Sequence, residues 1–234
     1  MRKPLLFLFL LSVSSLFAQV QYGDSAYTLR LDAGYAFNKT YSHYGNFDLG
    51  AFLPLNPCFE MQADLRLSTV NAYALGVQLR PKFALPVGEM YIETRAMYRP
   101  FVLSHVHEVT GGLSLGYRMQ YVDVLFGCGV RVMTPMTTDH GFSPSIVEPW
   151  IFLYQVQAFV RPQTSSWNIA MAVSNIDNYQ MERSAQPLFR LSGHYRPAPH
   201  WRVHLSAMCK PTGMFHLHAA FYGIELRGGM SYEF

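Results

Sequence analysis

The sequence alternates apolar and polar residues over many short segments, and this pattern constrains the fold more than any other feature. In residues 59–68, FEMQADLRLS, every odd position is apolar and every even position is polar or charged. Successive side chains of a β-strand point to opposite faces, so a period of two indicates a strand with one apolar and one polar face. The same alternation recurs in residues 27–33, 73–80 and 201–207. An all-β protein is therefore expected.

Twelve segments of this kind are separated by connections that alternate between short and long. Tight turns at one rim and longer loops at the other are typical of an outer-membrane β-barrel. A further candidate strand, residues 214–222, would make the number odd, whereas single-chain bacterial barrels have even numbers. We interpret it as an outer extension or loop, and fourteen or ten strands are the alternatives. The predicted strands cover residues 25–38, 45–55, 58–69, 72–85, 89–100, 107–119, 121–133, 150–162, 167–176, 186–196, 200–210 and 223–234.

Beyond the N-terminal region, no window approaches the roughly 18 successive apolar residues that a membrane-spanning helix needs. In hydrocarbon every backbone amide needs an internal partner, and a sheet meets that demand only when it has no edges. The sequence therefore predicts a closed antiparallel transmembrane β-barrel in the bacterial outer membrane.

The N-terminus has the layout of a secretory signal peptide. Arg2 and Lys3 precede an apolar run that begins at Leu5 and continues to about Phe17, and this run is too short for a membrane anchor. Ala18 is a plausible last residue before cleavage. We predict a cleaved signal peptide at residues 1–18 and a single outer-membrane barrel domain at residues 19–234.

Charged residues fall almost entirely on the strand face opposite to the lipid-facing residues. An Arg or Lys on the lipid face near the midplane would cost about 2–4 kcal/mol, which explains this sorting. The inward face carries 14 positive and 10 negative side chains: Arg30, Arg66, Arg80, Lys82, Arg95, Arg99, Arg118, Arg131, Arg161, Arg190, Arg196, Arg202, Lys210 and Arg227, with Asp32, Asp48, Glu60, Asp64, Glu89, Glu93, Glu108, Asp123, Glu225 and Glu233.

Two interpretations of this interior follow. Arg–carboxylate pairs could cross-link a narrow, mostly filled lumen, or a net positive lumen could attract anions. We favour the first, because opposite charges are interspersed along the same strands. The residues predicted to line the lumen are Arg66, Asp64, Arg80, Glu93, Arg95, Arg118, Asp123, Arg131, Arg190, Arg202, Glu225 and Arg227.

Aromatic residues mark the expected membrane interfaces. Trp150, Trp167 and Trp201 each stand at the start of a predicted strand, where an indole contacts lipid on one side and water on the other. The chain ends GGMSYEF, and this ending resembles the C-terminal targeting signal of bacterial outer-membrane barrels. The resemblance implies that Tyr232 and Phe234 are recognised by the barrel-insertion machinery.

A fainter resemblance begins at Trp167. The segments WNIAMAVSNIDNY, FRLSGHYRP and GIELRGGMSYEF are similar to parts of the long-chain fatty-acid transporter-like barrels, especially the outer-membrane components of type IX secretion in the Bacteroidetes lineage. The shared elements are an Asn-Ile pair after a strand and repeated Gly and aromatic residues at strand ends. The resemblance implies transport of apolar solutes, or a partner in the envelope or a secretion system.

Metal and disulfide chemistry receive little support. Cys58, Cys128 and Cys209 are widely spaced and odd in number, so they imply no disulfide framework. Four histidines from neighbouring segments could bind zinc or copper, but no in-phase Cys or acid completes a ligand set. We predict that they line the lumen or its rim, and we predict no cofactor. These histidines are His194, His204, His216 and His218.

The sequence also bears on catalysis. His204 and Ser206 have a spacing that outer-membrane lipases could use, but both lie on the inward face, and no Asn follows Asn178 to orient the imidazole. The repeated glycines at 111–112 and 127–129 suggest strand bends rather than ligand approach. We predict that the protein is not an enzyme, and no signature of nucleic-acid binding is present.

Three functions remain from these observations. The first is a structural, adhesive or assembly role, with partners bound through outer loops at residues 134–149 and 176–185. The alternative is a narrow pore or transporter for small or apolar solutes, and a lipid-modifying enzyme is a second, less favoured alternative. The expected partners are outer-membrane lipid, the insertion machinery and an envelope or secretion-system protein.

Overall fold

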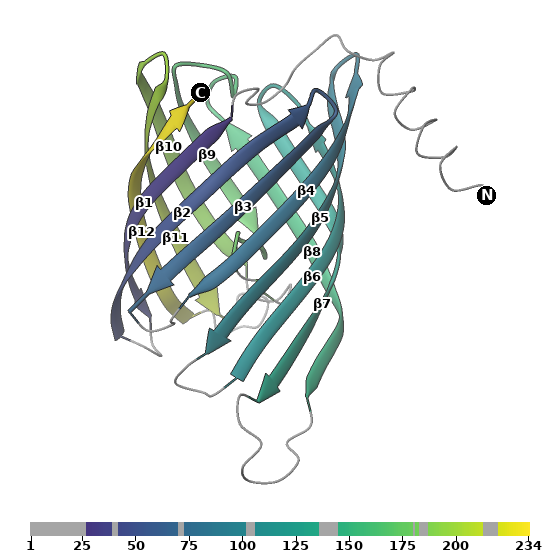
Figure 1. The fold of residues 1–234 in the computed structure, drawn as a ribbon, viewed down its shortest axis with the longest axis vertical. Coiled ribbons are helices and arrows are strands. Elements are labelled where there is room, and N and C mark those ends of the chain that lie inside the picture. The colour runs from purple at the N-terminus through teal and green to yellow at the C-terminus, as the bar shows by residue number, and fades with distance from the viewer. Residues whose placement is uncertain are drawn as a thin grey trace, which may run out of the picture.

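The protein forms one closed barrel of twelve antiparallel strands in the computed structural model (Figure 1). The structure describes residues 27–38, 42–69, 73–101, 106–135, 145–179, 181–182, 187–212 and 220–234. The fold class and the strand number predicted from the alternation are confirmed. The strands are β1 (Thr28–Asn38), β2 (Ser42–Asn56), β3 (Phe59–Ser68), β4 (Ala74–Leu85), β5 (Gly88–Phe101), β6 (Val106–Arg118), β7 (Val122–Pro135), β8 (Ile146–Phe159), β9 (Trp167–Ser174), β10 (Leu188–Ala198), β11 (Trp201–Thr212) and β12 (Ala220–Glu233).

Each strand pairs with its neighbours in the chain, and the last strand closes the ring on the first. The β1–β12 register runs from Thr28 opposite Glu233 to Asn38 opposite Gly223 without an interruption. This closure gives the amides of the outermost strands partners inside the sheet, as a hydrocarbon environment requires. No helix among the described residues is long and apolar enough to cross a membrane.

The short turns gather at one rim of the barrel, together with the start of β1 and the end of β12 (Figure 1). We call this the turn rim and the opposite one the loop rim. The turn between β4 and β5 ends at Gly88, whose φ of 124° favours glycine over any residue with a side chain. In outer-membrane barrels the short turns face the periplasm.

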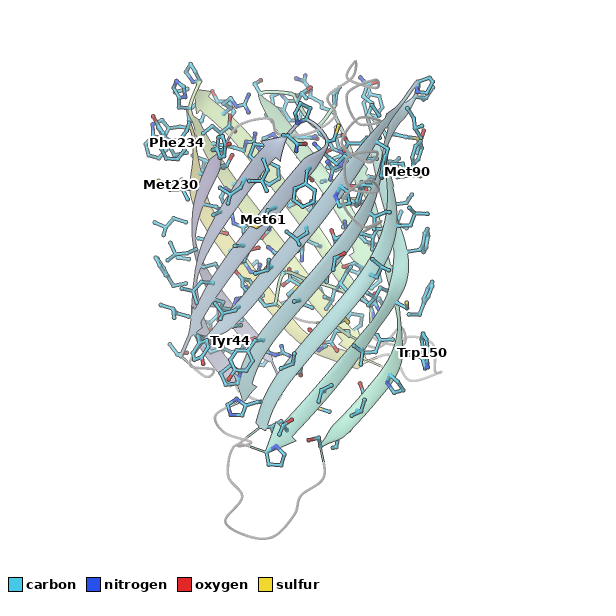
Figure 2. The ribbon with its side chains drawn as sticks, turned by 45° about the vertical axis from the view of Figure 1, so that its right-hand side comes forward. Tyr44, Met61, Met90, Trp150, Met230 and Phe234 are labelled. Atoms are coloured by element: carbon cyan, nitrogen blue, oxygen red, sulfur yellow. The ribbon has the colours of Figure 1, made fainter. Side chains whose placement is uncertain are left out.

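The side chains sort by face as the alternation predicts. Apolar residues such as Leu29, Leu113, Leu115 and Leu205 project from the outside of the wall, whereas the charged residues of the strands are turned inward. Figure 2 shows Trp150 and Phe234 on the outside, near opposite rims. An apolar exterior around a charged interior is the arrangement that lipid demands of a spanning barrel.

Several strand boundaries differ from the sequence prediction, and three of the differences bear on the site or the interfaces. β8 begins at Ile146 rather than at 150, so Trp150 lies inside this strand and not at its start. β9 ends at Ser174, and the chain then turns into the barrel instead of forming the predicted outer loop at 176–185. Residues 220–222 of the thirteenth candidate belong to β12, and the rest of it lies outside the described residues, as does the predicted signal peptide.

Candidate functional site: the barrel interior and its plug

The connection from β9 to β10 enters the barrel lumen. Ile176 and Met181 are 1% and 0% exposed and pair with each other through a β-bridge, so the chain folds back on itself inside the barrel. Asn175, Asp177, Tyr179 and Glu182 are buried with them. We call residues 175–179 and 181–182 the plug.

Asn175 fastens the two ends of the plug to β8. Its backbone N–H donates to the carbonyl oxygen of Tyr154 at 3.1 Å, and its side-chain oxygen accepts from the Tyr154 N–H at 2.8 Å. Its amide nitrogen donates to the carbonyl oxygens of Phe152 at 2.6 Å and Glu182 at 2.8 Å. An amide side chain carries both donors and an acceptor, so this one residue joins both ends of the plug to the wall.

One side of the plug is apolar. Ile176 and Met181 pack in a buried cluster whose other members come from β5, β7 and β8: Tyr91, Met97, Leu125, Ile151 and Leu153. These five side chains point into the lumen, where the alternation would place polar residues. Burying a side chain such as Ile or Met contributes about 1.5–3 kcal/mol, so this contact is a substantial part of what holds the plug.

Glycines of the wall make room for the plug. A Cβ at Gly129 would lie 2.6 Å from Met181 Sδ, and one at Gly112 would lie 3.2 Å from Met181 Cε. A Cβ at Gly76 would clash with the carbonyl oxygen of Asn178. The β7–β8 register shifts next to Gly129, as a strand bend there would require, and Gly112 and Gly129 also allow close approach by another segment of the chain, which the sequence interpretation missed.

The other side of the plug is anchored by arginines. Asp177 accepts from Arg190 at 2.6 Å and from Arg227 at 2.9 Å, and its backbone carbonyl accepts from Arg95 at 3.1 Å. Burial alone would raise the pKa of Asp177, but the positive charges of Arg227, Arg190 and Arg66 outweigh it and hold this pKa well below its usual range. The carboxylate is therefore ionised inside the lumen.

The remaining plug residues make further polar contacts across the barrel. The guanidinium of Arg66 lies over the Tyr179 ring, 4.3 Å from its centroid. Gln78 donates to the side-chain oxygen of Asn178 at 3.3 Å, and Lys210 forms an ion pair with Glu182. The plug thus supplies two carboxylates, Asp177 and Glu182, that a count of strand residues omits.

Within β3–β7, the strands' own side chains form the ionic contacts of the lumen. Arg80 bridges Glu93 at 2.6 Å and Glu60 at 3.4 Å, and Glu93 also pairs with Arg95. Arg118 pairs with Asp123 at 3.1 Å, which also accepts a hydrogen bond from the Tyr91 hydroxyl at 2.8 Å. This half of the interior corresponds to the charge-paired lumen that the sequence predicts.

The other predicted lumen residues also lie on the inward face. Arg66 pairs with Asp48 at 2.8 Å and with Glu225 at 3.1 Å, while Arg227 pairs with Glu225. Each remaining residue has an acidic partner: Arg30–Asp64 at 2.6 Å, Arg131–Glu148 at 3.0 Å, Arg202–Glu233 at 2.6 Å and Arg190–Asp177 at 2.6 Å.

The cations and the acids of these pairs differ in exposure. The Arg30 side chain is 29% exposed and its partner Asp64 is 1% exposed, and Arg190 at 28% compares with Asp177 at 2%. Arg80 at 19% compares with Glu93 at 0%. In these three pairs the guanidinium group is thus more exposed to the lumen than its carboxylate partner.

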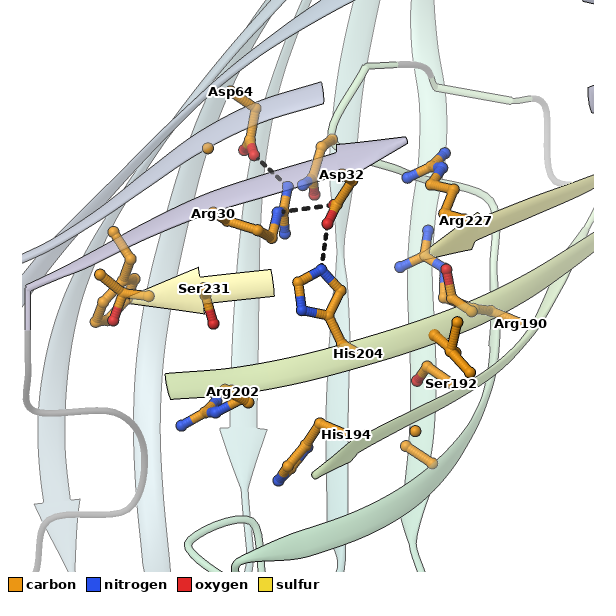
Figure 3. A pocket seen from close by; sticks show the side chains of 18 of the residues that line it. Arg30, Asp32, Asp64, Arg190, Ser192, His194, Arg202, His204, Arg227 and Ser231 are labelled. Atoms are coloured by element: carbon orange, nitrogen blue, oxygen red, sulfur yellow. Dashed lines mark hydrogen bonds and ion pairs between the residues drawn. The ribbon is translucent and has the colours of Figure 1, made fainter. Parts of the chain in front are cut away.

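The plug lies between two cavities. The inner cavity, about 350 Å³, occupies the half of the lumen near the turn rim, and Asp177 and Asn178 form part of its wall. Figure 3 shows it from close by, with Arg190 and Arg227 among its lining residues. The outer cavity, about 90 Å³, lies toward the loop rim and is lined by Tyr179, together with Arg66 and Tyr44. A path along the lumen through both cavities would pass the plug.

The histidines stand in the wall of the inner cavity. His204 forms an ion pair with Asp32, which Arg30 contacts at 3.1 Å from the other side (Figure 3). Among the described residues, no group of three His, Cys, Asp or Glu could hold a metal ion, and His216 and His218 lie outside the described ranges. No hydrogen bond joins His204 to Ser206 within the described part of the chain, so the geometry does not assemble the lipase-like pair.

The aromatic residues of the termini and turns cluster at the turn rim. The Tyr232 ring meets Trp201 edge-on at 5.0 Å and Phe234 at 4.9 Å. Trp167 packs under the guanidinium of Arg161 at 3.9 Å, and Trp150, which is 83% exposed, stands near the loop rim. Recognition of Tyr232 and Phe234 by the insertion machinery stays a prediction.

A closed twelve-stranded barrel with an apolar exterior and a charged lumen has the fold of bacterial outer-membrane β-barrels. The translocator domain of the autotransporter NalP from Neisseria meningitidis is similar to it, with a TM-score of 0.56, 10% identity, and coverage of 99% of this chain and 95% of that chain. The NanC porin has a TM-score of 0.54 at 10% identity and covers 88% of this chain and 100% of its own.

The KdgM porin is also similar, with a TM-score of 0.51, 9% identity, and coverage of 88% of this chain and 99% of that chain. A further structure of the KdgM porin is in complex with disordered oligogalacturonate. No protein-family model and no curated protein matches the sequence. The resemblance to fatty-acid transporter-like barrels of the Bacteroidetes lineage stays a prediction.

Proposed function

We propose that the protein is a narrow outer-membrane pore for small solutes, closed in this conformation by its own plug. The observation that carries the proposal is the position of the plug between two cavities, one in each half of the lumen. The fold that the chain shares with the NanC and KdgM porins supports a pore. The assembly role that the sequence favoured has less support, since residues 176–179 and 181–182 of its proposed outer loop lie inside the barrel.

The contacts of the plug are compatible with its displacement. It is not part of the barrel ladder, which closes without it, and it is held by ion pairs, hydrogen bonds and one apolar contact. A neutral hydrogen bond contributes about 0.5–1.5 kcal/mol net, and a hydrogen bond to a charged group contributes more. Because the barrel ladder closes without the plug, displacement of the plug would leave the wall intact.

Conductance of the purified protein in planar bilayers tests the pore. We expect low or intermittent current from the unchanged protein and a larger, more persistent current from Gly76→Ala, because the new methyl group takes the space of the Asn178 carbonyl. Gly111→Ala is the matched control, since a Cβ there meets no atom closer than 3.8 Å. Silence from both the unchanged protein and Gly76→Ala would overturn the pore and favour a structural barrel.

A structural or assembly role remains the second candidate, and the dense pairing of Arg80, Glu93, Arg95 and Arg118 favours it, because these residues fill one half of the lumen. Such a barrel would stay silent in every variant that folds. A protein partner in the envelope, if one exists, would then be found by cross-linking at the loop rim.

A further inference from the structure

The arginines that hold the plug also border the inner cavity. Arg190 and Arg227 each direct a guanidinium nitrogen to a different oxygen of Asp177, at 2.6 Å and 2.9 Å. Two guanidinium groups on the two oxygens of one carboxylate form a strong, charge-assisted arrangement. Such a site does not depend on the rest of the aspartate residue, and a carboxylate of another molecule would satisfy it equally.

We propose that Arg190 and Arg227 form a binding site for the carboxylate of a small hydrophilic organic acid, and that Asp177 occupies this site while the plug is closed. The proposal rests on the proposed pore, and it names the class of solute and the group that the solute displaces.

The inner cavity gives a solute access to this site without passing the plug. Arg190 and Arg227 both line the cavity (Figure 3). The Arg190 side chain is 28% exposed, whereas that of Asp177 is 2% exposed. The volume of about 350 Å³ is at the lower end of the range of small-molecule sites, which is roughly 300–1,000 Å³. The solute is therefore expected to be no larger than one or two sugar units.

The rest of the cavity wall indicates the chemistry of the solute. Arg30, Arg202 and His204 line the cavity beside their acidic partners Asp64, Glu233 and Asp32, and Figure 3 shows Ser192 and Ser231 in the same wall. Hydroxyl and imidazole groups bind the hydroxyls of a solute, while the arginines bind its acid group. These polar groups and the small volume of the cavity favour a compact hydroxylated carboxylate over the long chain of a fatty acid.

Binding of the solute and closure of the plug would then exclude each other. A carboxylate on Arg190 and Arg227 takes the two ion-pair partners of Asp177, so the plug is held less tightly, by its remaining polar contacts and the apolar cluster. A ligand that binds only when Asp177 has left shifts the population toward the open state by its affinity for that state. The solute would thus help to open the pore.

Calorimetric titration of the detergent-solubilised protein tests the site. The probes are D-glucuronate and D-glucose, which differ in one carboxylate. We expect weak glucuronate binding to the unchanged protein, binding at least about 10-fold tighter to Asp177→Ala, in which the competing carboxylate is gone, and no binding of glucose. Equal binding of the two sugars, or unchanged glucuronate affinity in Asp177→Ala, would overturn the proposal.

A second pair of variants removes the arginine. Arg190→Gln alone also removes a partner of Asp177. The double variant Asp177→Ala/Arg190→Gln is therefore the cleaner test, and it should lose the glucuronate affinity that Asp177→Ala gains. Arg131→Gln is the matched control, because Arg131 pairs with Glu148 and does not line the inner cavity. Retention of the gained affinity in the double variant would contradict the assignment.

The titration separates the site from the pore. Glucuronate binding in this pattern by a protein that stays silent in bilayers would overturn the pore and leave the site. A conducting Gly76→Ala variant of a protein that binds no glucuronate in any of these forms would overturn the site and leave the pore.

Discussion

The two halves of the barrel interior are filled in different ways. Within β3–β7 the lumen is occupied by the strands' own side chains, with Arg80, Glu93 and Arg118 in one network. The plug packs its apolar side on β5, β7 and β8 and extends Asp177 to arginines of β10 and β12, where it borders the inner cavity. The ion-pair network of β3–β7 behaves as a fixed core, whereas the plug beside the inner cavity can leave its site. A wall of one repeating pattern can therefore enclose a rigid region and a responsive region.

The largest effect should come from the fixed half. Glu93→Gln leaves Arg80 and Arg95 without their shared carboxylate, and breaking a buried ion pair costs roughly 3–5 kcal/mol. We expect a large drop in the temperature at which the barrel loses its heat-modifiable gel mobility. Thr94→Ala, on the exposed face of the same strand, is the control. A drop in this temperature no larger than that of Thr94→Ala would show that the β3–β7 half is not a fixed core.

The next effect should come from the apolar contact of the plug. Met181→Ala removes a fully buried side chain, and such a change costs about 2–5 kcal/mol where the site cannot relax. Because the plug can leave the lumen, the cost should appear as opening, with a higher bilayer conductance and little loss of barrel stability. Met171→Ala, on the exposed face of β9, should change neither quantity. A stability loss as large as that of Glu93→Gln would erase the contrast between the halves.

A smaller effect is expected from pH. The low pKa of Asp177 in the folded barrel means that its stabilisation is complete above the ordinary carboxyl pKa of about 3.9 and is lost only as the pH falls through the lower folded value. Open probability should therefore be flat from pH 8 to about 5 and rise only in stronger acid. An increase near pH 6 would show that another group controls the plug.

The smallest effect should come from the lipid-facing surface. Trp150→Ala changes a side chain that is 83% exposed on the outer wall, away from both halves of the lumen. We expect a stability change below about 1 kcal/mol and unchanged conductance. A change in conductance would indicate that the wall near the loop rim moves together with the plug.

The sequence predicted the wall well because its pattern is local. Alternation in residues 59–68 or 201–207 sets the strand, its lipid face and its charged face from neighbours in the chain, so twelve strands and the inward charges could be placed without coordinates. Pairings across the lumen, such as Arg30 with Asp64, depend on barrel closure and could only be expected in general terms.

The plug could not be predicted in the same way, because its contacts join segments that are distant in the chain. The sequence nevertheless contains features that indicate the plug. Ile176 and Met181 are apolar residues in a segment otherwise rich in polar ones, and Leu125 and Leu153 break the alternation by turning apolar side chains inward. Gly76 on the inward face leaves space that no strand side chain fills. Apolar residues and glycines on the polar face of a barrel predict a segment packed inside it.

The most direct test of the account is the accessibility of position 174, where β9 leads into the plug, to a water-soluble maleimide. Cys58, Cys128 and Cys209 are first replaced by alanine, and Ser174→Cys, a nearly isosteric change at a 5% exposed residue beside Ile176, is then labelled in this background with and without Gly76→Ala. The account predicts slow labelling when Gly76 is present and labelling at least about 10-fold faster when Gly76→Ala expels the plug, because protection reports the population of the closed state. Equally fast labelling in both proteins would contradict a plug that fills the lumen.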